Sequence, residues 1–116
     1  MFMAQPFSSR KLSAQSTETL DRLASRLRQA RRRRGWSQEK IAGLLSVGLN
    51  TYRRMEQGSP SVAVGVWIQA FFVLGTIREL DGLLLYDNDR LGVALSQQKR
   101  DRRMGKLTID DLADSL

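Results

Sequence analysis

The sequence predicts an all-α protein with five short helices and a helical C-terminal extension. Apolar residues recur at steps of three and four along much of the chain, as on one face of a helix. Glycines follow several of these stretches, where the left-handed conformation can end a helix. A serine precedes another stretch, where its hydroxyl can cap a helix start. The length of 116 residues suits one domain with a short extension.

The first helix is predicted from about residue 20 to residue 34, after an N-terminal arm. Residues 1–18 are rich in Ser, Gln and Thr and lack periodicity, so we expect a flexible arm there. The apolar stripe of the helix consists of Leu20, Leu23, Leu27 and Ala30. Arginines occupy its other faces, and Gly35 is expected to end it.

Two short helices joined by a tight turn are predicted next. Ser37 is expected to cap the first of them, over residues 38–45. Residues 46–48 are too few for anything but a turn. The second helix is predicted over residues 49–57, with Gly58 as its stop.

Three further helices are predicted over residues 65–74, 77–86 and 90–102. The most apolar stretch of the chain, Val62 to Leu74, is far shorter than the roughly 20 residues that span a bilayer, so it indicates a buried helix. We expect a DNA-binding domain over residues 19–86 and a partly disordered extension over residues 87–116 for partner or dimer contacts.

Cysteine and histidine are both absent. Their absence removes thiolate nucleophiles, disulfides and nearly all zinc chemistry, and it leaves an enzyme only carboxylates, lysine and tyrosine. The sequence has no nucleophile–base pair and no glycine-rich phosphate loop. The acidic cluster at residues 87–89 lacks the later glutamate of a calcium loop and indicates a turn and helix cap. We expect no enzymatic activity, no cofactor and no metal.

The net charge of +7 is concentrated in the first half of the chain. Residues 1–59 hold 12 lysines and arginines against four acids, a net charge of +8, whereas residues 60–116 hold seven against eight, a net charge of −1. This distribution indicates a polyanionic partner: nucleic acid first, and second an anionic membrane surface that the leucine stripe would face. Residues 1–10 lack the apolar run of a secretory signal, so we expect a cytoplasmic protein.

The two helices at residues 38–45 and 49–57 have the spacing of a helix-turn-helix unit, whose second helix lies in the major groove of DNA. The segments that carry a family resemblance are Gly35-Trp36-Ser37-Gln38-Glu39-Lys40-Ile41-Ala42, Leu45-Ser46-Val47 and Thr51-Tyr52-Arg53-Arg54-Met55-Glu56-Gln57-Gly58. Over residues 20–86 the chain resembles the XRE family of λ-repressor-like and Cro-like domains. The resemblance implies a five-helix λ-repressor-like domain that binds double-stranded operator DNA.

The resemblance also implies a DNA-contacting role for eight residues. Those expected to contact bases are Leu49, Asn50 and Arg54. Those expected to contact phosphates are Gln38, Thr51, Arg53, Arg33 and Ser46. Asparagine can pair with adenine, arginine with guanine, and a leucine methyl can touch the thymine methyl, whereas phosphate contacts set the register. Gln38 is further implied to buttress the third helix, and Glu56 occupies an acidic position that is usually structural.

The sequence departs from the family pattern at three positions. Gly48 stands where Ser or Thr normally caps the third helix, so that helix start is expected to be less well anchored. Leu49 replaces a more common polar residue, and Ser46 replaces the common turn glycine.

A second resemblance, to HipB-type antitoxins, is narrower. It is carried by Pro60-Ser61-Val62-Ala63-Val64-Gly65, Phe71-Phe72-Val73-Leu74-Gly75 and Asp89-Arg90-Leu91-Gly92-Val93-Ala94-Leu95. It implies a homodimeric repressor that binds its own operator and holds a HipA-like kinase toxin inactive. The alternative is an orphan or phage-type XRE regulator without a toxin partner.

Several side chains allow both a structural and a functional interpretation. The arginine run at residues 31–34 is either a solvated helix face or a set of phosphate contacts, and the two are compatible. Trp36 and Trp67 are interpreted as packing residues, and Tyr52 as a core residue. Because Phe71 and Phe72 are adjacent on a helix, one of them must point away from its neighbour's face and could anchor an interface.

Overall fold

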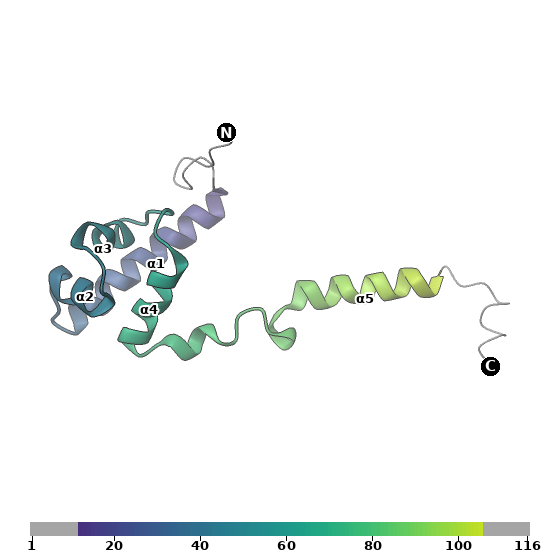
Figure 1. The fold of residues 1–116 in the computed structure, drawn as a ribbon. Helices are drawn as coiled ribbons and strands as arrows, with labels where there is room; N and C mark the ends of the chain where they lie inside the picture. The colour runs from purple at the N-terminus through teal and green to yellow at the C-terminus, as the bar shows by residue number, and fades with distance from the viewer. Residues whose placement is uncertain (1–11, 106–116) are drawn as a thin grey trace, which may run out of the picture. The chain divides into compact units, whose positions relative to one another are not determined.

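The computed structural model describes residues 12–105, and within that range every regular element is helical (Figure 1). The five α-helices are α1 (Ala14–Arg33), α2 (Gln38–Leu45), α3 (Leu49–Glu56), α4 (Val64–Leu74) and α5 (Arg90–Gly105). Two short 3₁₀ helices are η2 (Ile77–Leu80) and η3 (Tyr86–Asn88). The chain divides after Ile77 into an N-terminal unit (described residues 12–77) and a C-terminal unit (described residues 78–105).

Helix α1 begins at Ala14, six residues before the predicted start at Leu20. Ser13 caps it, because the Ser13 side chain accepts a hydrogen bond from the Ser16 backbone N–H at 3.0 Å. Residues 14–18 therefore belong to the helix and not to a flexible arm, while residues 1–11 lie outside the described residues. At the other end Gly35 has φ +66°, the left-handed conformation expected of a residue after a helix end.

The bounds predicted for α2 are confirmed, and those for α3 are confirmed to within one residue. The Ser37 hydroxyl accepts from the Lys40 backbone N–H at 3.0 Å and caps α2. Ser46 ends α2 in the left-handed conformation, with φ 56°. Gly48 precedes α3 without a side-chain cap, as its missing hydroxyl predicts.

Helices α1 to α4 pack around one apolar cluster. Its buried members are Leu27, Ile41, Ala42, Leu45, Tyr52, Met55, Trp67, Ala70 and Leu74. Leu20 and Leu23 pack against this cluster, so the leucine stripe of α1 faces protein and the membrane-surface alternative is wrong. Across the described residues no helix combines the length and apolar character that crossing a bilayer requires.

Helix α4 confirms the helix predicted from the most apolar stretch, but it is buried on one side only, because Val64, Ile68 and Phe72 are exposed. Trp67 is buried, and its ring lies 6.1 Å from that of Phe71. Phe72, the next residue, is 60% exposed, as the adjacency of the two phenylalanines predicted. Trp36 is half-buried and packs against the same cluster.

The helix predicted over residues 77–86 is not present. The 3₁₀ helices η2 and η3 and the turns between them replace it. Gly82 weakens a continuous helix here, and Asn88 Nδ2 donates to the Gly82 carbonyl at 2.8 Å, which stabilises the turn instead. The two units of the chain meet after Ile77. The predicted domain bounds at residues 19–86 stay a prediction. Asp89 then caps α5 by accepting from the Gly92 backbone N–H at 3.1 Å.

Candidate nucleic-acid interface

The two sides of α3 differ sharply in burial. Tyr52 and Met55 are completely buried and Glu56 is 4% exposed, so this side faces the other helices. Asn50 and Arg54 are exposed and stand four residues apart, which places them on one outer face. Helix α3 therefore presents a polar face with an amide and a guanidinium outside the core.

Four of the other residues predicted to contact DNA lie on α3 or in the turn before it. Leu49 is half-buried at the first position of α3. Thr51 is half-buried, and its hydroxyl accepts from Arg54 Nη2 at 3.3 Å. Arg53 and Ser46 are exposed, the latter in the turn between α2 and α3. These four positions and the Asn50/Arg54 face thus belong to one turn and one helix.

A buried carboxylate holds α3 in place. Glu56 accepts hydrogen bonds from Arg31 Nε of α1 at 2.6 Å, from Gln38 Nε2 of α2 at 2.7 Å and from the Tyr52 hydroxyl at 2.8 Å. Each of the first three helices therefore contributes at least one member to this network (Arg31, Gln38, Tyr52 and Glu56). The network sets the position of α3 relative to α1 and α2, which confirms a structural role for Glu56.

The network shifts the ionisation of its members. Burial alone would raise the pKa of Glu56, but hydrogen bonds from Arg31, Gln38 and Tyr52 outweigh it and lower that pKa. The hydrogen bond to Glu56 raises the pKa of Arg31 against the opposing effect of burial. Burial, followed by the hydrogen bond to Glu56, raises the pKa of Tyr52. The Arg31–Glu56 pair is therefore ionised and the tyrosine neutral at physiological pH.

Gln38 connects this network to the outer surface. Its amide nitrogen donates to Glu56, and its amide oxygen accepts from Arg53 Nε at 3.4 Å. Both the nitrogen and the oxygen of the Gln38 amide therefore contact residues of α3, as the implied buttressing role requires. Its implied phosphate contact stays a prediction.

The four arginines at residues 31–34 do not form one continuous surface, because their side chains have different contacts. Arg31 is buried in the Glu56 network, and its Nη1 also donates to the Trp36 carbonyl at 2.9 Å. Arg34 Nη2 donates to the Leu74 carbonyl at the end of α4 at 2.7 Å, and its guanidinium lies 5.9 Å from the Trp36 ring centroid. Only Arg32 and Arg33 are left as exposed side chains without such structural contacts among the described residues.

Sequence reasoning missed the structural role of Arg31, although a signal was present. Arg31 stands four residues after Leu27 and seven after Ala24, so it continues the buried stripe of α1. An arginine on an apolar stripe needs a buried acidic partner. Glu56, on the inner face of the third helix, was the candidate.

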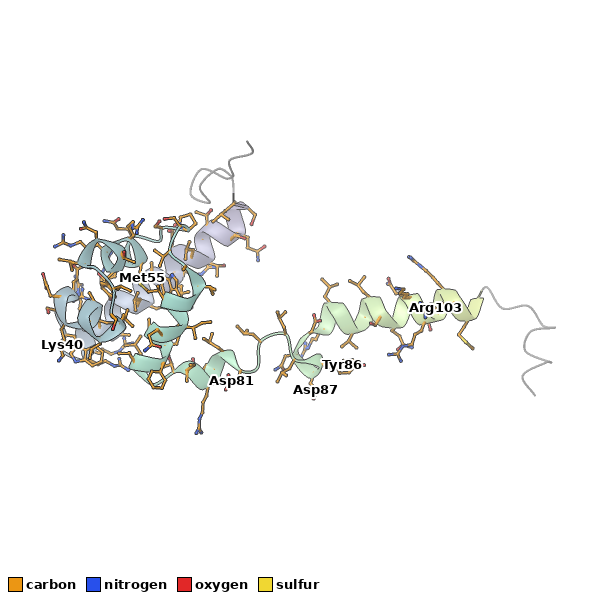
Figure 2. All side chains as sticks on the ribbon, viewed as in Figure 1. Lys40, Met55, Asp81, Tyr86, Asp87 and Arg103 are labelled. Atoms are coloured by element: carbon orange, nitrogen blue, oxygen red, sulfur yellow. The ribbon has the colours of Figure 1, made fainter. Side chains whose placement is uncertain are left out.

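The side chains on the ribbon show the same contrast between inside and outside (Figure 2). Met55 of α3 lies among the side chains of the packed helices, whereas Lys40 of α2 lies at their edge. The first unit thus consists of a packed interior and a basic surface, and α3 has one side in each.

A short helix pair, α2 and α3, joined by the three-residue turn at residues 46–48 and braced by α1, defines a helix-turn-helix DNA-binding protein. The family model of the helix-turn-helix domain matches residues 22–81, just over half of the chain, and the chain belongs to this family. No curated protein and no solved structure gives a significant match to the chain.

Proposed function

We propose that this protein is a transcriptional repressor that reads a specific operator with α3. The observation that carries the proposal is the outward face formed by Asn50 and Arg54, opposite the buried side of Tyr52, Met55 and Glu56. An α-helix fits the major groove, where asparagine can pair with adenine and arginine with guanine. The basic first half of the chain favours approach to the phosphate backbone.

The test is selection of a binding site from random duplex DNA, followed by footprinting of the wild type and of Asn50→Ala and Arg54→Ala variants. The proposal expects one enriched sequence, with each variant losing preference at its own base pair. Glu39→Ala serves as a control, because Glu39 is exposed on α2 and lies outside the proposed contacts. Binding without any enriched sequence would contradict specific recognition.

We further propose that the protein binds as a two-fold dimer. One recognition helix reads few base pairs, and paired half-sites one helical turn apart double the contact. The C-terminal unit supports this proposal because none of its residues 78–104 is buried, and its exposed apolar side chains need a cover. The largest of them are Leu83, Leu84, Leu85, Tyr86, Leu91, Leu95 and Met104.

Charge favours a second copy of this chain as the cover. Residues 78–89 hold one arginine against four acids, a net charge of −3, and residues 90–105 hold five lysines and arginines against one acid, a net charge of +4. Two copies in antiparallel order would place the acidic half of each unit against the basic half of the other. In an isologous contact of this kind, the acidic and the basic half of each copy both face opposite charge.

Light scattering tests the dimer with two matched sets of variants. Leu91→Asp with Leu95→Asp is expected to give a monomer. Val64→Asp with Phe72→Asp changes an exposed apolar stripe on α4 and is expected to leave the dimer intact. The reverse result would assign the dimer surface to α4, and a monomeric wild type at micromolar concentration would refute the dimer.

We also propose a more specific role: the repressor is a HipB-like antitoxin that neutralises a HipA-like kinase toxin. Its support is the resemblance in three sequence segments, at residues 60–65, 71–75 and 89–95. The test is co-expression with any kinase encoded by the adjacent gene, followed by purification and a kinase assay. A stable, inactive complex is expected. Failure to bind or inhibit such a kinase would favour the orphan regulator.

A further inference from the structure

A cleft of about 360 Å³ lies between α1, the start of α2 and the second half of α3. Its volume falls in the range of about 300–1,000 Å³ that small-ligand sites have. Its charged lining residues are Arg28, Arg31, Arg32, Arg53 and Glu56. Four guanidinium groups and one carboxylate give this lining a net charge of +3.

The single carboxylate does not neutralise the three outer arginines. Glu56 is buried and forms its short ion pair with Arg31, at 2.6 Å. Arg28 Nε lies 3.9 Å from Glu56 Oε2, and its Nη2 donates to the Glu56 backbone carbonyl at 3.3 Å. The Arg32 side chain forms no hydrogen bond or ion pair with the rest of residues 12–105. Arg28, Arg32 and Arg53, the cleft arginines, thus share one space with their charges largely unopposed.

We propose that the cleft arginines bind a backbone phosphate of the DNA whose major groove α3 occupies. Guanidinium groups match phosphate oxygens in charge and in hydrogen-bond geometry, and a phosphodiester placed between them relieves their mutual repulsion. The proposal rests on the proposed DNA-binding function. It goes beyond it by assigning the main phosphate clamp to Arg28 and Arg32, which the family resemblance did not mark.

The position of the cleft beside the exposed face of α3 favours a DNA strand over a free ligand as its occupant. Arg53 precedes Arg54, so the two side chains leave the helix about 100° apart. A groove that receives the Asn50/Arg54 face has a phosphate strand along each side, and Arg53 points toward one of these flanks. Arg28 and Arg32 stand four residues apart on α1 and meet the same flank from the opposite wall of the cleft.

Duplex binding over a series of salt concentrations tests the proposal, with fluorescence anisotropy as the readout. The probe is a mixed-sequence duplex, so that phosphate contacts dominate binding. The cleft variant is Arg28→Gln with Arg32→Gln. The matched control is Arg22→Gln with Arg26→Gln, which removes the same charge from exposed positions of the same helix outside the cleft. Arg32→Gln alone guards against a folding defect, because it leaves the Arg28 contact to α3 intact.

The cleft variant is expected to bind about tenfold more weakly and to lose about one from the slope of log affinity against log salt. In the control, the salt slope is expected to change by less than half as much as in the cleft variant. Arg32→Gln alone is expected to give a slope change between those of the two double variants. Equal losses in both double variants would overturn the proposal, because the arginines would then act only as diffuse charge. A wild type that ignores duplex DNA at low salt would instead refute the proposed function itself.

A second measurement separates the DNA strand from a free phosphorylated ligand. Inorganic pyrophosphate is added to the wild type while thermal unfolding is followed. No stabilisation below millimolar concentration is expected if the cleft needs the duplex to present its phosphate. Saturable stabilisation at micromolar concentration that the cleft variant lacks would overturn the DNA assignment in favour of a free anion.

Discussion

The two units of the chain are both helical, but they differ in what their side chains contact. In the N-terminal unit four helices enclose one apolar cluster, and a buried carboxylate ties α1, α2 and α3 together. In the C-terminal unit residues 78–104 contain no buried side chain, and Leu84 is 86% exposed. Helical sequence alone therefore does not make a core. The first unit contains the groups that stabilise it, whereas the second presents apolar groups that a partner could cover.

The largest effect expected from this contrast comes from Glu56→Ala. The substitution leaves the Arg31 guanidinium buried without its carboxylate, which costs about 3–5 kcal/mol of unfolding free energy. Urea denaturation measures the loss. Glu39→Ala on the exposed side of α2 is the control and is expected to change stability by less than about 0.5 kcal/mol. A loss below about 1 kcal/mol for Glu56→Ala would show that the network does not brace the unit.

A pair of leucine truncations compares the two units directly. Leu27→Ala opens a cavity in the cluster and is expected to cost about 2–5 kcal/mol. Leu91→Ala, at a 71% exposed position of α5, is expected to leave the unfolding of the N-terminal unit unchanged and to weaken the dimer. Urea denaturation with light scattering separates these effects. Equal losses of stability would mean that the C-terminal unit has a core of its own.

The proposed function divides the exposed arginines of the N-terminal unit into base contacts and phosphate contacts. Arg54→Ala is expected to cost about 1–3 kcal/mol on the selected operator and to relax preference at one base pair. Arg33→Ala is expected to weaken binding to all sequences alike and to lower the salt slope by about one. Anisotropy titrations on operator and mixed-sequence duplexes measure both. The assignment is refuted if the two variants behave identically on the two duplexes.

Acid pH gives the smallest expected effect. The pKa of Glu56 is lowered in the folded protein, so its ionised form contributes stability above its ordinary pKa of 4.5. This contribution is lost progressively as the pH falls from 4.5 through the lower folded pKa. Urea denaturation at several pH values should show a steeper acid loss for the wild type than for Glu56→Gln. Parallel curves would contradict an ionised Glu56.

Local signals in the sequence were enough for the helix pair that carries the candidate site. Ser37 supplies a cap, Gly48 and the preceding turn residues end one helix and begin the next, and the apolar spacing sets the inner face. These signals act within a few residues, so they can be read without the fold. The same kind of local signal predicted a helix over residues 77–86, and this helix is not present. Its apolar residues find no surface to pack against, and packing stabilises most short helices.

The sequence by itself determined the all-helical class, the turn between α2 and α3, and the outward position of Asn50 and Arg54. Only the tertiary structure decided which groups the arginines of α1 contact and which of these arginines remain exposed. Arg31 and Glu56 are 25 residues apart, and their pairing follows from the packing of α1 against α3. The apolar stripe of α1 indicates that Arg31 faces inward. Its pairing with Glu56 depends on the helix packed against α1, and no pattern within α1 contains that information.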